Sequence, residues 1–346
     1  MATPIKVRSP YIVEVTGTLG DSTKVEVFLW NDPSSVPANP NYTLEKDIPS
    51  SIVAQASYDI SPYIREFISH AVYSEVNADT AANVSEYCYC NTKVYKNGVL
   101  QTGGGSYTEE LICFDGFGFF EEGQNPTQEN AMLTEGTYYV EEAGNTGGVY
   151  YTTEPSGTWE AKWTGLETGT TSTVSITNTV GYVPYIPTAL KWEKVKLEFL
   201  ESSVVQYTYN FYPICEPKYV TINCDFVNRW GVWQRLVFFK ASTDNFAMDN
   251  KEYNLMSQDT DYSITQNRRQ VFNVNANESI KCNTGWVPES YREVIKELML
   301  SETIRIDDKP VILSTKSTTL QKSINDNNIN YGLEFKYAYK ALNYIV

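Results

Sequence analysis

Apolar and polar residues alternate along much of the chain with a period of two, which is typical of β-strands that face a core on one side. The alternation is most regular from Ile329 to Tyr339, where every second residue is Ile, Leu, Phe or Tyr. It recurs in residues 195–199, where Val, Leu and Phe alternate with Lys and Glu, and in residues 24–30, which end in an apolar run. The pattern predicts a mainly β fold.

The densest apolar stretch is residues 224–240, CDFVNRWGVWQRLVFFK. Two apolar runs flank a centre that holds two tryptophans and two arginines around Gly231. The β-branched and aromatic content, interrupted by this glycine, predicts two strands joined at a tight corner or bulge. The second of these strands is expected to be buried on both faces.

A short helix is predicted over residues 61–69. Ser61 suits the capping position because its hydroxyl accepts hydrogen bonds from free amides, and Pro62 suits the first helical position. The apolar face of this helix comprises Tyr63, Ile64, Phe67 and Ile68. We expect that face to pack against a sheet.

A second helix is predicted over residues 288–301, opened by Pro288. Its apolar residues recur at helical spacing and are Tyr291, Val294, Ile295, Leu298 and Met299. The other side is predicted to carry the charged residues Arg292, Glu293, Lys296 and Glu297.

The chain has 346 residues, more than usually fold around a single hydrophobic core, so we expect two or three β-sandwich-like modules with a few short packing helices. Residues 1–75 form the predicted N-terminal β module, which contains the helix at 61–69. Residues 76–185 are rich in Gly and Tyr and form a predicted β insertion or second module. Residues 186–346 form the predicted C-terminal β module, with the helix at 288–301.

The net charge of −15 disfavours a nucleic-acid partner, because it repels phosphate backbones. The 26 tyrosines suit half-buried sheets and protein contact surfaces alike. The N-terminal sequence predicts no signal peptide, and no segment is apolar enough over the length of a membrane-spanning helix. We therefore expect a protein made in the cytoplasm that does not associate with a membrane.

The cysteines and the single histidine predict no metal site. Cys88 and Cys90 are two apart on a predicted strand and therefore point to the same face, while the others are scattered: Cys113, Cys215, Cys224 and Cys282. We expect reduced thiols. The Asp- and Asn-rich residues 243–250 and 325–328 do not fit a calcium-binding loop and are predicted to be turns.

No catalytic motif is present, and one histidine, His70, has no partner in a known motif. Asp115, Glu121 and Glu122 lie in a Gly- and Phe-rich loop, where an acid and a nucleophile of a glycosidase are one interpretation. The alternative is an ordinary acidic loop, in which the same residue types occur without catalytic function. The glycines at 103–105 predict a hairpin tip, because no phosphate-binding motif leads into a helix there. We predict no enzyme activity and no cofactor.

Two aromatic groups are candidates for binding. Trp159 and Trp163, with the Tyr-rich hairpins, are candidates to stack on sugar rings, although core packing explains them equally. Arg229, Trp230, Trp233 and Arg235 are a candidate subunit interface, since aromatic and Arg side chains anchor many protein contacts. The alternative is that both tryptophans fill the core of the C-terminal module and the arginines lie at its edge.

Several segments together resemble structural proteins of tailed phages that infect Bacteroidota, including crAss-like phages. They are CDFVNRWGVWQRLVFFKAS, NANESIKCNTGWVPESYREVIKELMLSE, NINYGLEFKYAY, SPYIVEV, KVEVFLWND, YDISPYIREFI, FDGFGFFEEGQNP and EGTYYV. These segments are packing and turn signatures, and it is their order along most of the chain that carries the resemblance.

The resemblance implies a virion component located in the tail and assembled in the cytoplasm of the host bacterium. Because long heptads and triple-helical repeats are absent, a compact homo-oligomeric hub or collar is expected rather than a fibre shaft. Its partners are then other copies of itself and other phage tail proteins. A receptor-binding or glycan-binding tail module is the alternative. The resemblance assigns no functional residue.

Overall fold

The computed structural model describes residues 2–31, 36–49, 52, 54–71, 78–102, 110–123, 125, 127–141, 147–154, 157–214, 218–256, 260, 264–265, 267–320 and 329–343. Strands account for 52% of the structure and helices for 7%, which confirms the mainly β fold. The chain divides into two compact units. The first is Met1–Cys215 with Phe226–Leu236 and Glu293–Ser301, and the second is Glu216–Asp225 with Val237–Arg292 and Glu302–Val346.

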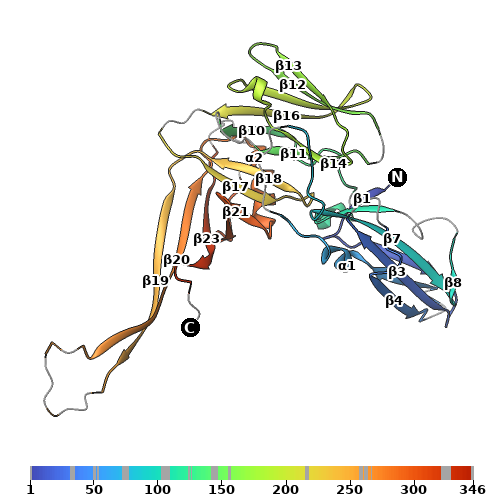
Figure 1. Ribbon diagram of the computed structural model, residues 1–346, viewed down its shortest axis with the longest axis horizontal. Coiled ribbons are helices and arrows are strands. Elements are labelled where there is room, and N and C mark those ends of the chain that lie inside the picture. Colours follow the sequence, from blue (N-terminus) through green and yellow to red (C-terminus); the bar gives the residue numbers. More distant parts are fainter. Residues whose placement is uncertain are drawn as a thin grey trace. The chain divides into compact units, whose positions relative to one another are not determined.

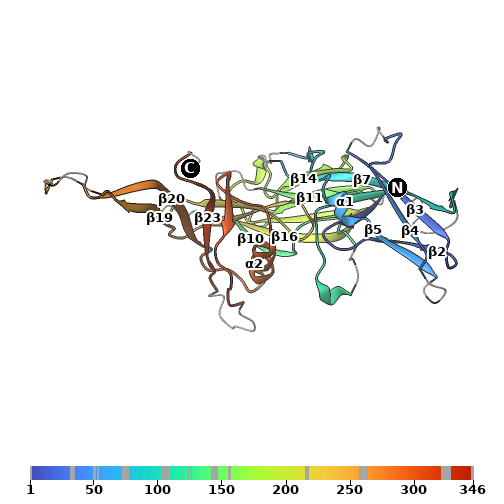
Figure 2. The ribbon, with the colours of Figure 1, turned by 90° about the horizontal axis from the view of Figure 1, so that it is seen from below.

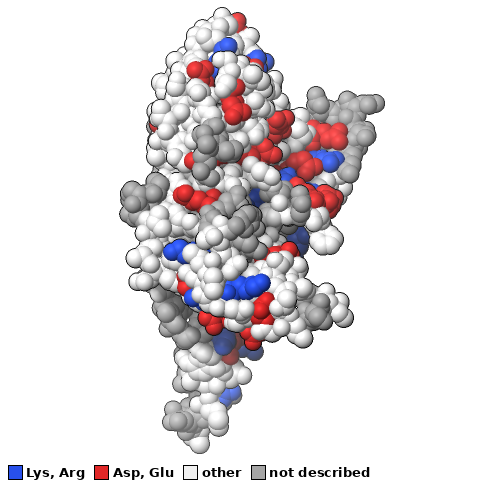
Figure 3. Space-filling view, turned by 90° about the vertical axis from the view of Figure 1, so that its right-hand side faces the viewer, with Lys and Arg blue, Asp and Glu red and all other residues white. Residues whose placement is uncertain are grey.

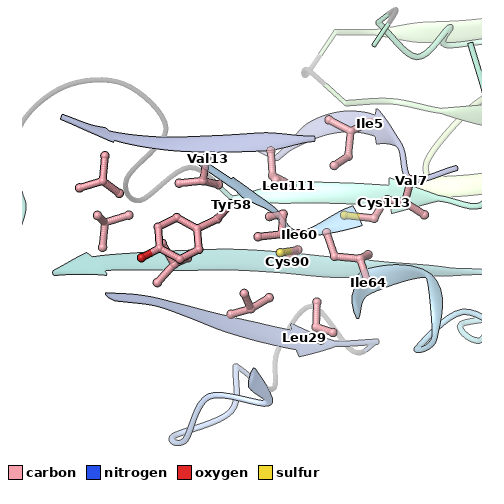
Figure 4. Close-up of a cluster of buried hydrophobic side chains, with 14 of the residues drawn as sticks. Ile5, Val7, Val13, Leu29, Tyr58, Ile60, Ile64, Cys90, Leu111 and Cys113 are labelled. Carbon is pink, nitrogen blue, oxygen red and sulfur yellow. The ribbon is translucent and has the colours of Figure 1, made fainter. Parts of the chain in front are cut away.

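A β-sandwich-like pair of sheets forms one end of the first unit (Figure 1). The larger sheet has the order β1 (Thr3–Lys6), β9 (Leu111–Phe114), β7 (Tyr87–Lys96), β3 (Ser22–Trp30) and β4 (Tyr42–Asp47), with β8 (Val99–Leu100) on β7. The smaller sheet pairs β2 (Ile12–Thr16) with β5 (Gln55–Asp59). Figure 4 shows the core between them, where Val13, Leu29 and Tyr58 come together.

The predicted first helix is shorter than expected: α1 covers Ser61–Arg65. Its cap also differs, because the Asp59 carboxylate accepts hydrogen bonds from the Ser61 amide at 3.1 Å and from the Ser61 hydroxyl at 2.6 Å. Ile64 is buried in the core described above and Ile68 packs against it. Phe67 remains exposed, so only part of the predicted apolar face is used.

The larger sheet is buried on both faces at one end, which explains the continuous apolar run that ends β3. Val25, Val27 and Leu29 point into the core of the sheet pair, whereas Phe28 and Trp30 point into a second core on the opposite face. That second core is shared with a sheet of order β11 (Gly148–Thr152), β14 (Val180–Pro184) and β6 (Thr80–Ala81).

A further sheet packs on the other side of β11 and β14. Its order is β10 (Gly136–Glu141), β16 (Val204–Ile214), β15 (Val195–Glu201), β12 (Trp159–Gly165) and β13 (Thr171–Ser175). The rings of Tyr185 and Phe211 stack with centroids 4.6 Å apart, and the Trp163 indole donates a 3.1 Å hydrogen bond to the Pro184 carbonyl. The strand predicted at 195–199 is confirmed, with alternate residues buried.

The unit boundaries differ from the predicted modules. A boundary near residue 75 would cut the first sheet, because β1 pairs in parallel with β9 and β3 pairs with β7. A boundary near residue 185 would separate β10 from its parallel partner β16. These pairings join strands that are far apart in sequence, and a local pattern of residues does not indicate which distant strands will pair.

The second unit is built on strands that pair antiparallel in the order β21 (Ile304–Ile306), β22 (Lys309–Leu313), β23 (Gly332–Lys340), β20 (Arg269–Asn283) and β19 (Thr243–Asn254). Two further strands, β17 (Ile222–Val227) and β18 (Trp233–Phe238), are each divided between the two units. The predicted hairpin between β21 and β22 is confirmed, with its turn at Asp307 and Asp308, which have φ of 45° and 66°. β23 confirms the long alternating strand, with Leu333 and Phe335 fully buried.

A long hairpin extends from this sheet. β19 pairs with β20 from Thr243 to Asn254, whereas β23 pairs with β20 only from Asn277 to Asn283. β19 and β20 therefore continue as a two-stranded ribbon beyond the end of β23, as Figure 1 and Figure 2 show. We call this hairpin the arm. Residues 243–250, predicted to be a turn, are a strand of the arm.

The second predicted helix is confirmed as α2, Tyr291–Leu300. Its residues Tyr291, Val294, Ile295 and Leu298 are buried as expected. Glu297 differs from the prediction, because it is 2% exposed although it was assigned to the polar side. The glycines at 103–105, the asparagine cluster at 325–328 and Cys215 lie outside the described residues.

Candidate interaction site

The turn at residues 228–232 joins β17 to β18, as the Gly231 interruption predicts. Asn228 is fully buried, and its side-chain oxygen accepts hydrogen bonds from the amides of Trp230 at 3.0 Å and Val232 at 3.4 Å. Its side-chain nitrogen donates to the Met132 carbonyl at 3.0 Å. One amide side chain therefore closes the turn and ties it to a distant segment.

Two glycines let this turn approach the loop that follows β9. Gly231 has φ of 83°, and a Cβ there would lie 2.4 Å from the backbone of Asp115 and Gly116. A Cβ on Gly116 would lie 2.7 Å from the backbone of Arg229 and Trp230. The Phe117 amide donates a 2.8 Å hydrogen bond to the Arg229 carbonyl. Only glycine at both positions permits this backbone contact.

The candidate interface residues are placed mainly inside the first unit. Trp230 and Trp233 are 6% and 1% exposed and belong to the second core of that unit. The Trp233 indole donates a 2.9 Å hydrogen bond to the Ala71 carbonyl. Arg235 is 7% exposed, and its backbone interacts with the Tyr185 hydroxyl. This burial favours core packing for both tryptophans, but in a core of the first unit and not in the predicted C-terminal module. A subunit contact stays a prediction.

Arg229 is the partly exposed member of the group. Its guanidinium donates a 2.8 Å hydrogen bond to Glu122, and its Cζ lies 5.1 Å from the centroid of the Phe119 ring. The ammonium of Lys296 lies 3.9 Å from the same ring. Two cations on one aromatic ring fix the position of Phe119. The neighbouring Phe120, in the single turn η1 (Phe120–Glu122), is fully exposed.

A hollow of about 670 Å³ opens beside these phenylalanines. Its lining residues are Arg8, Ser9, Pro10, Ile12, Gly118, Phe119, Phe120, Gly123 and Asn125. The loop is held by the Ser9 hydroxyl, which accepts a 2.7 Å hydrogen bond from the Gly118 amide. The hollow is therefore an ordered aromatic recess with an Arg and an Asn at its edge.

Two buried ionisable groups, Lys6 and Glu297, interact electrostatically with Arg229. Burial and the nearby Arg229 lower the pKa of Lys6 to about 8, although Glu122, Glu129 and Glu297 oppose this shift. Burial raises the pKa of Glu297 to about 7, against the 2.8 Å hydrogen bond that its Oε1 accepts from the Thr134 hydroxyl. At neutral pH part of the Glu297 population is therefore protonated, in a region that also holds the buried Lys6 and the partly exposed Arg229.

Of the three carboxylates considered for glycoside hydrolysis, Asp115 and Glu122 have structural partners, whereas Glu121 is exposed. Asp115 accepts a 2.8 Å hydrogen bond from the Arg65 guanidinium, and its other oxygen lies 3.3 Å from His70 Nε2. Burial acts to raise the pKa of Glu122, but hydrogen bonds from the Phe119 amide and Arg229 outweigh it and lower this pKa. Asp115 and Glu122 thus hold the loop that contains them in place.

The sugar-stacking candidates are not on the surface: Trp159 and Trp163 are 5% and 1% exposed. Among the described residues, no cluster of His, Cys, Asp and Glu is arranged to hold a metal ion. In the same part of the chain no helix has the length and apolarity to cross a membrane. Figure 3 shows acidic and basic side chains interspersed over one face.

Three comparisons of the chain with known proteins gave no match. No protein-family model matches it, and no curated protein or solved structure is similar to it. The function must therefore be argued from the residues, the surfaces of the two units and the resemblance in sequence described above.

The arm is the surface that sequence reasoning missed. Eleven residues of β19 are exposed and one is intermediate, so no residue of this strand is buried. Large apolar side chains are exposed along the arm, namely Phe246, Met248, Tyr253, Val271 and Phe272. β19 is a terminal strand of its sheet, and in the described part of the chain its one strand partner is β20. The outer edge of β19 is thus a second candidate interaction site.

Proposed function

We propose that this protein is a structural component of a phage tail, an oligomeric hub or collar that bridges neighbouring tail components. Its partners are other copies of itself and other tail proteins, and its place is the virion tail, assembled in the cytoplasm of the host bacterium. The resemblance of its sequence segments to tail proteins of phages that infect Bacteroidota supports this proposal. The proposal assigns no catalytic role and no cofactor.

The observation that carries the proposal is the exposed apolar arm. A two-stranded ribbon is at best marginally stable in water, and long edge strands with apolar side chains are prone to pair with other chains. Phe246 and Met248 are 65% and 64% exposed on such an edge strand. Large apolar side chains gathered on one exposed edge strand support a site of protein contact there.

The proposal is tested by locating the protein in intact particles and counting its copies. Quantitative mass spectrometry of purified virions gives the copy number, and labelled antibodies viewed by electron microscopy give the position. We expect several copies in one ring on the tail. Absence from the virion, or a position only on peripheral spikes, would contradict the hub.

A glycan- or receptor-binding tail module is the second candidate, and the aromatic recess favours it. Exposed rings such as that of Phe120 stack on sugar faces, and Arg8, Ser9 and Asn125 supply polar groups at the edge. Saturable binding on an array of bacterial glycans that is lost in Phe120→Ala would support this function. Binding that Phe120→Ala leaves unchanged would exclude the recess.

A further inference from the structure

The edge of β19 is self-complementary in sequence. Its regular part ends at Asp249, where the pairing with β20 shifts register. When two copies of this part are placed antiparallel with Ala247 opposite itself, Phe246 faces Met248 of the second copy and Asn245 faces Asp249 of the second copy. Each of these pairs occurs twice because the arrangement has two-fold symmetry.

We propose that β19 pairs with β19 of a second copy of this chain, antiparallel, about a two-fold axis at Ala247. This inference rests on the proposed function as an assembly of copies and names one contact within it. The pairing extends the sheet of the second unit across the axis, which is the way an extended strand adds to an exposed sheet edge.

The side chains on one face of β19 support a second copy as the partner. Phe246 and Met248 pair with Glu278 and Ala276 of β20. Directly paired residues point to the same face, where Ala276 and Ile280, on either side of Glu278, are 3% and 6% exposed. Two Phe–Met pairs across the axis would therefore add apolar contacts to a face of the sheet that already contains buried apolar residues.

Neighbouring registers are disfavoured by charge. Moving the axis by one residue, to Phe246, sets Asp244 against Met248 of the second copy. Moving it the other way, to Met248, sets Asp249 against Ala247 of the second copy, so in both cases a charge is desolvated beside an apolar side chain. The register with Ala247 on the axis avoids both penalties.

The contact is tested first by cross-linking. In Ala247→Cys the two new thiols lie opposite each other at a separation within the range for a disulfide, so mild oxidation of the full chain should give a covalent dimer. The matched control is Asn245→Cys, in which the two thiols lie four residues apart along the strands, about 13 Å. It should stay uncross-linked, as should the wild type. Equal cross-linking of both variants, or none in Ala247→Cys, overturns the pairing.

The register is tested by charge. Asn245→Asp sets two Asp–Asp contacts across the axis and should raise the dissociation constant of the dimer about tenfold in analytical ultracentrifugation. Adding Asp249→Asn removes both contacts and should restore wild-type association. Residue 245 is exposed, so unfolding midpoints of the variants should match the wild type. Failure of the second change to restore association overturns the register.

The two proposals fail in distinguishable ways. A protein that is present in the tail ring but gives no cross-link at Ala247→Cys overturns the β19 contact and leaves the hub intact. A protein that forms the cross-linked dimer but is absent from virions overturns the proposed function and leaves the contact intact.

Discussion

The turn at 228–232 and strand β19 both carry large apolar side chains, which are buried in the turn and exposed on β19. Trp230 is almost fully buried by its own chain, whereas Phe246 on β19 is 65% exposed. The turn is closed by two hydrogen bonds that the side chain of Asn228 accepts, and glycines at two positions permit its close contact with a neighbouring loop. β19 has one strand partner in the described part of the chain and no buried residue. Aromatic content alone therefore does not distinguish a core from a contact surface, whereas the surroundings of the backbone do.

The largest effect separating the two regions is expected from Gly231→Ala. The new Cβ would overlap backbone atoms of Asp115 and Gly116 at 2.4 Å, and the positive φ adds strain, so we expect a loss of more than about 5 kcal/mol of stability. The matched control is Gly20→Ala, with φ of 84° but no atom within 4 Å, which should cost about 1 kcal/mol. Denaturant unfolding compares the two, and equal losses would contradict the close approach.

The next largest effect is expected from Trp233→Ala, compared with Phe246→Ala on the arm. Removing a buried indole together with its hydrogen bond to Ala71 should cost about 4 kcal/mol in unfolding free energy. Phe246→Ala should change the stability of the isolated chain by less than about 0.5 kcal/mol, because the ring is exposed. A large loss from Phe246→Ala in a monomeric sample would show that the ring packs within its own chain.

A smaller, pH-dependent effect is expected from Glu297→Gln. The folded pKa of Glu297, about 7, exceeds the ordinary value of 4.5, so its contribution to stability decreases as the pH rises from about 4.5 to 7. The neutral Gln avoids this loss, and at pH 8 the variant should be more stable than the wild type by up to about 3 kcal/mol. The two proteins should converge near pH 4.5. Thermal unfolding across this range checks it, and a difference independent of pH would contradict the burial of this charge.

The smallest effect is expected from Glu122→Gln, which removes the ion pair with Arg229 at the edge of the buried turn. The two side chains are 29% and 22% exposed, so solvent screens the pair. We expect a loss below about 1 kcal/mol that shrinks as salt is added. Denaturant unfolding at low and high salt measures it. A larger loss that is insensitive to salt would mean that Glu122 acts mainly through its hydrogen bond to the Phe119 amide.

Much of the strand pattern was predictable because burial leaves a period of two in the sequence. β3, β15 and β23 alternate as expected, and the corner at Gly231 lies where the apolar run is interrupted. The same logic explains why β19 was missed. A strand with no buried face has no alternation, and its Asp and Asn residues are typical of turns.

Close contacts between segments that are distant in sequence could not be predicted from local patterns either. Gly116 and Gly231 lie more than a hundred residues apart in sequence, yet the backbone at each approaches the other closely. No local sequence pattern relates these two glycines. Glu297 was assigned to the polar side of its helix because helical periodicity takes no account of what covers each side. Its burial depends on Thr134, which is supplied by a distant segment. The sequence therefore indicated Arg229 as a candidate, which stays a prediction, and it did not indicate the residues that surround it.

The thiols give each unit its own internal reporter of unfolding. Cys88, Cys90 and Cys113 lie together in the core of the first unit, while Cys224 and Cys282 are buried in the second. Burial and the neighbouring sulfurs hold the pKa of Cys113 far above its ordinary value, and burial raises that of Cys282 to about 12. Alkylating reagents need an accessible thiolate, so modification of each of these five cysteines requires that its own unit open first. Peptide mapping after timed alkylation would thus rank the kinetic stability of the two units within a single unmodified chain.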